Sequence, residues 1–281
     1  MQCMKKIISR HRYSDKTFRA FQTIITGFFK KYGRDFPWRN THNPYHILVS
    51  EFMLQQTQTE RVLKKYQLFI VRFPHAASLA NASFQDVMRQ WQGLGYNRRA
   101  LFLQKTAQLI LKIHDGICPS DVTVLTRLPG IGHATASAIC AFAFNKPSVF
   151  VETNIRSVFL HFFFSQKNNV KDREILSLVE KTLDKAHPRQ WYYGLMDYGA
   201  FLKKNCSNPS RKSAHHAKQS PFVNSNRQIR GLILKILTHA SPVFEDDLYA
   251  RLSFERKRVY DSVTQLIKEK LIARQGTYIV I

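Results

Sequence analysis

The chain has 281 residues, and its 44% hydrophobic content with 21 Phe provides core material for one large and one small domain. Lys and Arg number 43 against 19 Asp and Glu, so the formal net charge is +24. This excess is far larger than solubility requires and indicates a polyanionic partner, with nucleic acid ahead of an anionic membrane surface. A ribosome-associated or simply basic protein is the alternative interpretation.

The sequence contains no segment that predicts membrane insertion or export. No apolar run approaches the roughly 20 residues of a membrane span, and the basic start MQCMKKIISRHRY lacks the apolar core of a signal peptide. The four cysteines, Cys3, Cys118, Cys140 and Cys206, are too scattered for a zinc knuckle or an iron–sulfur cluster. We therefore expect reduced thiols, no metal, no iron–sulfur cofactor, no membrane partner, and a cytoplasmic monomer.

The first predicted helix is amphipathic and basic. Residues 1–34 carry nine Lys and Arg and a single acid, and large apolar side chains recur there at helical spacing. A second helix opens at Pro44, and Glu51 lies in its apolar stretch. Burying a carboxylate is costly unless it is paired or stays protonated. Glu51 is therefore either a salt-bridged helix residue or a functional acid.

Three further helices are predicted at 60–73, 79–91 and 97–114. The second of them ends at a Gly-Leu-Gly-Tyr turn whose last residue is Tyr96, and no acid occurs between Asp86 and Asp115. In this basic setting Tyr96 is either a wedge for a base stack or a helix-capping aromatic, and the sequence favours neither.

The run LPGIGHATASAI at 128–139 predicts a helix end, a tight turn and a new helix. Pro129 disfavours helical backbone in the residue before it, and Gly130 and Gly132 permit backbone shapes that other residues avoid. The new helix is lined with Ala, and its first N–H groups beside two glycines form a natural phosphate cradle. An ordinary corner between two helices is the alternative. Glu152 lies thirteen residues after Ile139, at the end of an apolar run. A carboxylate in this position predicts a charge at the edge of a cleft.

The C-terminal part predicts a linker and a second, smaller domain. Helices are expected at 171–186 and 191–204, and no acid occurs from 198 to 244. We expect the polar stretch 205–222 to pack on the large domain. Residues 227–281 read as three helices and a β-hairpin, which is a winged-helix pattern. The predicted domains are therefore 1–222 and 227–281, and the small one serves either DNA binding or protein docking.

Six motifs occur in an order that resembles one family. They are FPWR at 36–39, SEFMLQQTQ at 50–58, GLGY at 93–96, LPGIG at 128–132, ETNIR at 152–156 and MDYGA at 196–200. Together they resemble the MutY-like adenine DNA glycosylases within the helix-hairpin-helix, or endonuclease III, superfamily. The resemblance implies a mainly α, helix-hairpin-helix DNA glycosylase fold, here with a small winged-helix-like domain. It also implies a nucleoid-associated enzyme of base excision repair that flips a mismatched or damaged base out of double-stranded DNA.

The resemblance also implies a role for each motif. Glu51 takes the position that protonates the base and handles water, and Glu152 that of the ionised group near the sugar. The hairpin is expected to grip a phosphate, and a monovalent cation can bind there. The expected DNA-binding residues are Gln55, Gln56, Tyr96, Gly130, Gly132, Asn154 and Arg156. The expected base pocket is bordered by Trp38, Arg39 and Tyr193.

Four features depart from the family pattern. Glu152 replaces an Asp, and Ala134 stands where lyase-active members carry a Lys, so no Schiff base is expected there. Tyr193 stands roughly where adenine enzymes place Gln or Glu, which weakens the case for adenine. Within these 281 residues we expect neither the iron–sulfur loop nor the domain that senses oxidised guanine, since the winged-helix-like module takes the place of that domain. Adenine opposite guanine or oxidised guanine is therefore the first hypothesis. The alternatives are a thymine or uracil mismatch glycosylase, another modified base, or a silent DNA-binding homologue.

Overall fold

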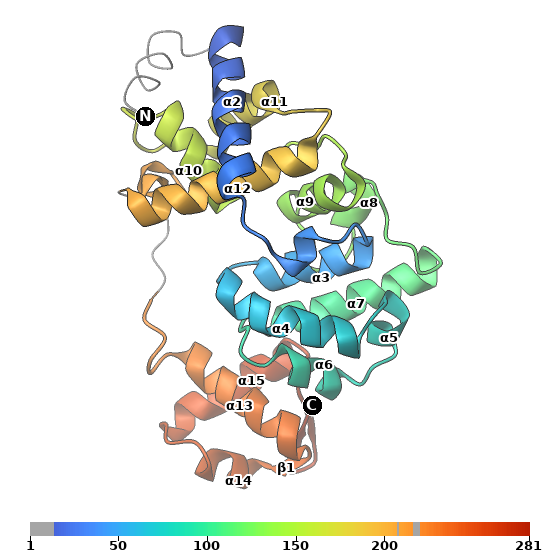
Figure 1. Ribbon diagram of the computed structural model, residues 1–281. Helices are drawn as coiled ribbons and strands as arrows, with labels where there is room; N and C mark the ends of the chain where they lie inside the picture. The colour runs from blue at the N-terminus through green and yellow to red at the C-terminus, as the bar shows by residue number, and fades with distance from the viewer. Residues whose placement is uncertain (1–13, 207, 216–219) are drawn as a thin grey trace. The chain divides into compact units, whose positions relative to one another are not determined.

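The structure is a computed structural model that describes residues 14–206, 208–215 and 220–281. The chain forms two compact units, each made of several segments (Figure 1). Unit 1 comprises Met1–Pro44, Ser120–Thr126 and Ile131–Lys218, and unit 2 comprises Tyr45–Pro119, Arg127–Gly130 and Gln219–Ile281. The prediction of a mainly α fold is confirmed. Cys3 and the basic start of the first predicted helix lie outside the described residues.

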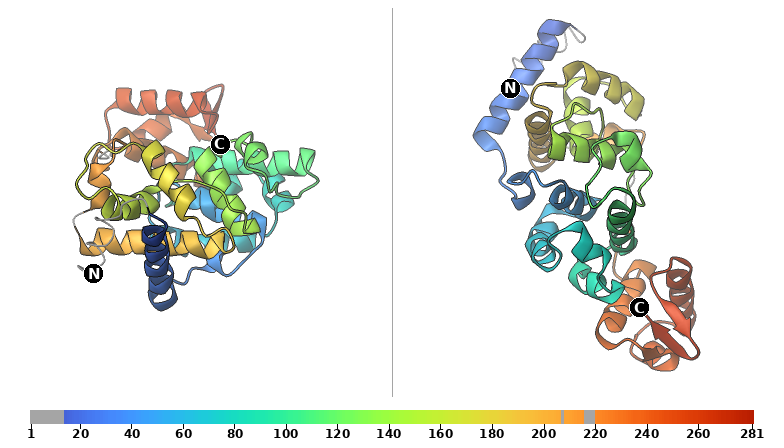
Figure 2. Two further views of the ribbon diagram at one scale, coloured as in Figure 1. Left: turned by 90° about the horizontal axis from the view of Figure 1, so that it is seen from above. Right: turned by 90° about the vertical axis from the view of Figure 1, so that its right-hand side faces the viewer.

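Unit 1 is helical throughout its described regular elements. These are α2 (Asp15–Tyr32), η1 (Pro37–Arg39), α8 (Val122–Thr126), α9 (His133–Phe144), α10 (Thr153–Phe162), α11 (Asp172–Thr182), α12 (Pro188–Asn205) and η2 (Pro209–Lys212). Helix α2 begins where the Ser14 hydroxyl accepts the amide hydrogen of Thr17. It crosses α12 (Figures 1 and 2), and its buried Phe21 makes edge contacts with aromatic rings of α10 and α12.

A glycine allows the start of α10 to lie against α12. A Cβ atom on Gly199 would lie 2.2 Å from the carbonyl oxygen of Asn154, so no other residue fits without moving the backbone. Residues 208–214 also pack on this unit, because the Ser210 and Ser157 hydroxyls share a hydrogen bond of 2.7 Å. Val170 adds two backbone bonds to the same stretch, to Lys212 and Ala214. For these residues the expected packing of the linker on the large domain is confirmed.

Unit 2 contains the remaining helices and a small sheet. Its elements are α3 (Pro44–Leu54, from Tyr45 onward), α4 (Thr59–Arg72), α5 (Ala76–Ala80), α6 (Phe84–Trp91), α7 (Arg98–Ile113), α13 (Asn226–Ala240), β1 (Val243–Phe244), α14 (Glu245–Ala250), α15 (Arg256–Lys268), β2 (Ala273–Gln275) and β3 (Tyr278–Val280). Helix α3 is mostly buried, as its apolar sequence predicts. Within the described residues, no helix of either unit is both long and apolar enough to cross a membrane.

The small C-terminal part has the predicted winged-helix pattern. Three helices precede a β-hairpin, which lies at the red, C-terminal end of the chain (Figure 2), and the antiparallel sheet has the strand order β1-β3-β2. Strand β1 is a difference from the sequence analysis, because a two-residue strand carries no detectable alternation. In the presumed recognition helix α15, Arg256 pairs with Asp246 and Arg258 hydrogen-bonds Asn224. The boundary between 222 and 227 stays a prediction.

Helix α13 of the small part packs on α6 through polar contacts at the end of α13. The Gln85 amide donates to the carbonyl oxygens of Leu237 and Thr238 at 3.5 and 3.3 Å. Arg89 donates to the same Thr238 oxygen at 3.1 Å, and Gln92 donates to the Thr238 hydroxyl at 3.2 Å. Gln85 and Arg89 thereby supply donors to the Thr238 carbonyl in the last turn of α13, whereas the Leu237 carbonyl also accepts the amide hydrogen of Ser241.

The buried carboxylate of Asp197 connects α12 to the FPWR segment. It accepts two hydrogen bonds from the Arg39 guanidinium, at 2.8 and 2.9 Å. It also accepts bonds from the Arg34 side chain at 2.7 Å and the Arg34 backbone at 2.9 Å. Burial acts to raise the pKa of Asp197, but the hydrogen bonds and charges of both arginines outweigh it and lower the pKa.

We predict that Asp197→Asn lowers the free energy of unfolding by about 3–5 kcal/mol, because it leaves the buried Arg39 charge without its partner. Since the folded-state pKa of Asp197 is lowered, its stabilisation is present above the unfolded pKa near 3.9 and lost as the pH falls through the folded value. The difference between wild type and variant should therefore shrink below about pH 3.9. Urea denaturation measures it, with the exposed Asp35→Asn as control, and equal losses would contradict the prediction.

Candidate functional site

The predicted site residues are divided between the two units. Unit 2 carries Glu51, Gln55, Gln56, Tyr96 and Gly130, and unit 1 carries Trp38, Arg39, Gly132, Glu152, Asn154, Arg156 and Tyr193. The hairpin loop is where the chain passes from one unit to the other, between Gly130 and Ile131.

The motif around Glu51 ends α3 and begins a turn. Glu51 is half-buried between the fully buried Ser50 and Phe52. Gln55 follows the end of the helix, and its side-chain amide donates to the carbonyl oxygen of Gly130 at 3.2 Å. Gln56 is exposed and has a left-handed backbone with φ of 54°. The structure thus ties Gln55 to the hairpin loop and leaves the Gln56 side chain toward solvent.

Tyr96 lies in the turn between α6 and α7. Its side chain is 40% exposed and its backbone is left-handed, with φ of 48°. The Trp91 indole donates to the carbonyl oxygen of Gly95 at 3.1 Å and fixes the turn from inside. The wedge role of Tyr96 stays a prediction, and its ring also lies 5.3 Å from the Arg99 guanidinium.

Arg99 is a buried cation that the sequence analysis missed. Its guanidinium donates to the carbonyl oxygens of Phe52 and Met53, at 2.6 and 2.9 Å, where α3 ends. It also donates to the Thr57 hydroxyl at 2.7 Å and the Gly95 carbonyl at 3.0 Å. Burial lowers the pKa of Arg99 to about 10.

The surroundings of Arg99 compensate its charge without a salt bridge. None of the carboxylates in the described part of the chain pairs with it. The negative end of the α3 dipole and the rings of Trp91 and Tyr96, 5.4 and 5.3 Å away, face the guanidinium instead. Arg99 thereby holds the turn after α3 and the turn that carries Tyr96 together. In the sequence, Arg99 directly follows Arg98, and nothing in that pattern indicates that the second arginine is buried.

The two hairpin glycines differ in what requires them. Gly130 has φ of 78°, and a Cβ there would lie 2.8 Å from Phe102 and 2.9 Å from Phe52. Gly132 caps α9, and a Cβ there would meet nothing within 4 Å. Steric packing therefore explains why position 130 is a glycine, but it does not explain the glycine at position 132. The open surroundings of Gly132 are consistent with close approach of a ligand. Ala134 is exposed on the first turn of α9.

Glu152 is the N-cap of α10. Its Oε1 accepts the amide hydrogens of Asn154 and Ile155 at 2.7 and 2.9 Å, and its Oε2 accepts from the Asn154 side chain at 3.4 Å. A helix N-terminus favours a negatively charged group, so the local structure suits a carboxylate. Lys203, which the sequence analysis did not single out, donates to the Asn154 side-chain oxygen at 2.8 Å.

Arg156 is occupied by an ion pair. Its guanidinium donates to both oxygens of Asp172, at 2.7 and 2.8 Å, and holds the pKa of that carboxyl below its usual value. The DNA contact expected of Arg156 stays a prediction, since this pair already engages Nε and one terminal nitrogen.

Two of the three residues expected to border the base pocket line a cavity, and the third is buried in the core. Trp38 is 5% exposed, stacks on Phe36, and does not line the cavity. Arg39 and Tyr193 do line it. The Tyr193 ring stacks on Phe142 with centroids 4.6 Å apart, and the Arg39 guanidinium lies 4.4 Å from the Tyr193 centroid. Tyr193 is thus a rigid wall packed against both groups.

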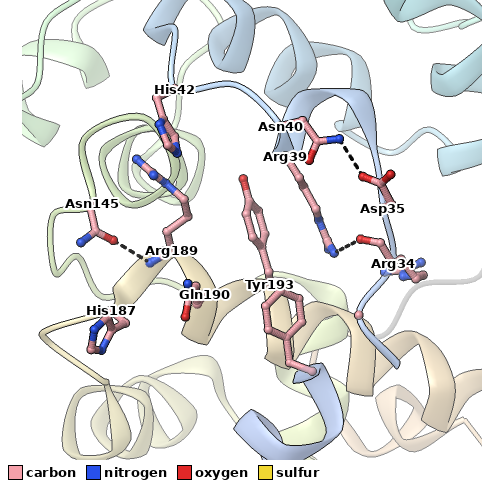
Figure 3. Close-up of a pocket in the computed structure, with 12 residues that line it drawn as sticks. Arg34, Asp35, Arg39, Asn40, His42, Asn145, His187, Arg189, Gln190 and Tyr193 are labelled. Carbon is pink, nitrogen blue, oxygen red and sulfur yellow. Dashed lines mark hydrogen bonds between the residues drawn. The ribbon is translucent and has the colours of Figure 1, made fainter. Parts of the chain in front are cut away.

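This cavity of about 540 Å³ lies wholly within unit 1. Figure 3 shows Tyr193 between Arg39 and Arg189, with its hydroxyl end directed into the pocket. The Arg189 guanidinium donates to the carbonyl oxygens of Phe142 and Ala143 at the end of α9. The lining residues that the sequence did not predict are Phe29, Gly33, Arg34, Asp35, Asn40, His42, Asn145, His187, Arg189 and Gln190. Cationic and amide groups of this kind can hold a polar ring or an anion.

No group of three His, Cys, Asp or Glu able to hold a metal ion occurs within 14–206, 208–215 and 220–281. Of the described cysteines, Cys118 and Cys140 are buried and Cys206 is half-buried, each as a free thiol. The expectations of no cofactor and of a monovalent cation at the hairpin stay predictions.

We predict that Gly130→Ala destabilises the protein by about 1–3 kcal/mol, because Ala strains the left-handed backbone and overlaps Phe102 and Phe52. Gly132→Ala should change the unfolding free energy by less than about 0.5 kcal/mol, since its Cβ meets open space. Thermal and urea denaturation of the two variants measure the difference. Equal destabilisation would show that the hairpin is packed differently.

We predict that Arg99→Met lowers the free energy of unfolding by about 2–3 kcal/mol, because the carbonyls at the end of α3 lose a charged donor. Amide hydrogen exchange in residues 93–97 should accelerate as the Tyr96 turn loosens. The adjacent, exposed Arg98→Met is the control and should stay within about 0.5 kcal/mol of wild type. Unchanged exchange in Arg99→Met would refute the proposed link between the two turns.

Known proteins resemble this chain in sequence and fold. Residues 49–184, which include Glu51 and Glu152, match the HhH-GPD superfamily base excision DNA repair protein family. An adenine DNA glycosylase of Buchnera aphidicola subsp. Baizongia pistaciae is 34% identical over 190 residues, covering 66% of this chain and 53% of that protein. A thymine/uracil-DNA glycosylase of Methanothermobacter thermautotrophicus is 29% identical over 192 residues, covering 67% and 87%.

A solved structure of a thermostable thymine-DNA glycosylase aligns with a TM-score of 0.62 at 26% identity, covering 72% of this chain and 97% of that one. The chain spans about half the length of the adenine DNA glycosylases that it matches. The matched segment contains the glycine that the hairpin turn requires and the capped carboxylate after it. With these features in the expected order on a helical fold, the resemblance of this chain to the helix-hairpin-helix glycosylase superfamily is confirmed.

Proposed function

We propose that the protein is a monofunctional DNA glycosylase of base excision repair that removes a mismatched base from double-stranded DNA. The observation that carries this proposal is the geometry of Glu152. Two backbone N–H groups at the start of α10 hold its carboxylate, within the segment that matches the superfamily. A fixed carboxylate can stabilise the positive charge that develops on the sugar as the N-glycosidic bond breaks.

The proposed mechanism assigns the other steps to residues of both units. Tyr96 enters the base stack, while Gln55 and Gln56 contact the minor groove as the target nucleotide is extruded. The hairpin amides near Gly132 bind a phosphate. Glu51 gives a proton to the departing base, and the glycosidic electron pair leaves with that base. Water then adds to the sugar carbon and gives a proton to the Glu51 carboxylate, which restores the acid.

The strand stays intact after excision in this proposal. Ala134 provides no amine where lyase-active relatives carry Lys, so the sugar forms no Schiff base there. The product is an abasic site in continuous duplex DNA, and the protein acts as a monomer at the nucleoid.

Adenine opposite guanine or oxidised guanine is the first substrate to test, because the first relatives found are adenine DNA glycosylases. A second candidate is a thymine or uracil mismatch. It is favoured by Tyr193, which replaces the Gln or Glu expected of adenine enzymes. The thymine/uracil-DNA glycosylase relative, of which this chain covers 87%, also supports it.

We predict that the purified chain releases one base from a panel of duplexes that each carry a single mismatch or lesion. Glu51→Gln should reduce single-turnover excision by at least about 100-fold while DNA binding survives, because the amide cannot supply the proton. Glu152→Gln should cost a similar factor by removing the charge that opposes the sugar cation. The exposed Glu60→Gln and Glu180→Gln are the matched controls.

The same assay separates the alternatives. Release of thymine or uracil supports the second candidate, and binding without release from any duplex identifies a silent homologue. Glu152→Asp should be slower than wild type if the longer side chain is adapted to this site. Borohydride should trap no covalent adduct. A trapped adduct, or full activity in Glu51→Gln, would overturn the mechanism.

A further inference from the structure

Lys203 and Asn154 form a hydrogen-bonded chain that ends on the carboxylate of Glu152. The Lys203 amine donates to the Asn154 side-chain oxygen at 2.8 Å, and the Asn154 side-chain nitrogen donates to Glu152 Oε2 at 3.4 Å. The other carboxylate oxygen, Oε1, is held by the two backbone amides at the start of α10. Both oxygens of Glu152 therefore have donors.

The chemistry of the three groups fixes the orientation of the amide. Lysine has only donors, and an ionised glutamate has only acceptors. An asparagine between them must turn its oxygen to the lysine and its nitrogen to the glutamate. The assignment of the two amide atoms, which is otherwise ambiguous, therefore follows from the ends of the chain.

Helix α12 places Lys203 at this point. Gly199 lies one turn before Lys203, and its missing side chain lets the Asn154 backbone approach the helix. Residues four apart share a helix face, so the Lys203 side chain emerges beside the same part of α10. The close contact and the hydrogen bond thus belong to one interface within unit 1.

Partial burial of the Lys203 ammonium group costs free energy, so a role for this lysine has to explain why it lies here. Burial lowers the pKa of Lys203, Glu152 acts to raise it, and the nearby Arg156 adds to the lowering. The direct partner of Lys203 is an amide oxygen and not a carboxylate. The contact therefore gives Lys203 little ion-pair stabilisation, whereas it gives Asn154 a fixed side chain.

We propose that Lys203 is a positioning residue for the candidate carboxylate, acting through Asn154 to fix the second oxygen of Glu152. This inference rests on the proposed function. Glu has one more rotatable bond than the Asp of the family pattern, so its carboxylate needs an additional constraint to keep one orientation toward the sugar. Preorganised groups stabilise a transition state because they do not have to reorient during the reaction.

The test compares neighbouring lysines of α12 in the full chain. Lys203→Met keeps the apolar stem and removes the donors, whereas Lys204→Met removes the same charge from an exposed position. Lys203→Met should lower the single-turnover excision rate by roughly 10- to 100-fold, with duplex affinity equal to that of Lys204→Met. Lys203→Arg, which restores a donor, should recover part of the rate.

A structural measurement makes the outcome independent of excision. In ¹⁵N-edited NMR spectra, the Asn154 side-chain and backbone amide signals should shift in Lys203→Met and stay in place in Lys204→Met. Equal rates and spectra for the two variants would overturn the positioning proposal. Absence of excision by wild type would refute the proposed function alone, because the spectra still report on Asn154. A borohydride-trapped adduct that disappears in Lys203→Met would make Lys203 a nucleophile and also overturn the proposal.

Discussion

Four hydrogen bonds converge on the carboxylate of Asp197, and the pocket side of unit 1 depends on them. The carboxylate holds the Arg39 guanidinium 4.4 Å from the centroid of the Tyr193 ring, and Tyr193 in turn stacks on Phe142. One buried charge on α12 thus fixes a wall of the pocket, although Asp197 itself does not line it. A buried charge that loses a partner is strongly destabilising. The segment that follows α2 is therefore held at the position where Arg34 and Arg39 reach Asp197.

Unit 2 uses a buried charge of the opposite sign for a similar purpose. Apart from the Thr57 hydroxyl, Arg99 binds main-chain oxygens, which every residue type supplies, so most positions of the turns around it can carry functional side chains. The two turns that present Gln56 and Tyr96 are therefore rigid in backbone and exposed in side chain. Under the proposed function, this combination suits Tyr96 for entry into the base stack and Gln56 for contact with the minor groove, because neither turn has to be ordered first.

The sequence predicts those parts of the site that depend on local rules. The tight turn at Gly130 follows from a few adjacent residues, and most helices follow from apolar spacing, although the helix predicted at 79–91 is divided into α5 and α6. The contacts that sequence analysis missed join distant positions. The Arg99 guanidinium reaches residues more than 40 positions earlier, and Lys203 reaches Asn154 across 49. Asp172 likewise engages Arg156, which the motif alone assigns to DNA.

Helix α6 binds the small C-terminal part in part by donating to carbonyl oxygens near the end of α13. These acceptors exist at the end of every helix, whatever its side chains. The attachment point is therefore generic, and an unrelated helical module with a similar terminal turn would satisfy the same donors. A lineage can in this way exchange the accessory module while α6, and the Tyr96 turn directly after it, keep their sequence. The polar attachment of the small part then resides in Gln85 and Arg89 of one short helix and in Gln92 directly after it.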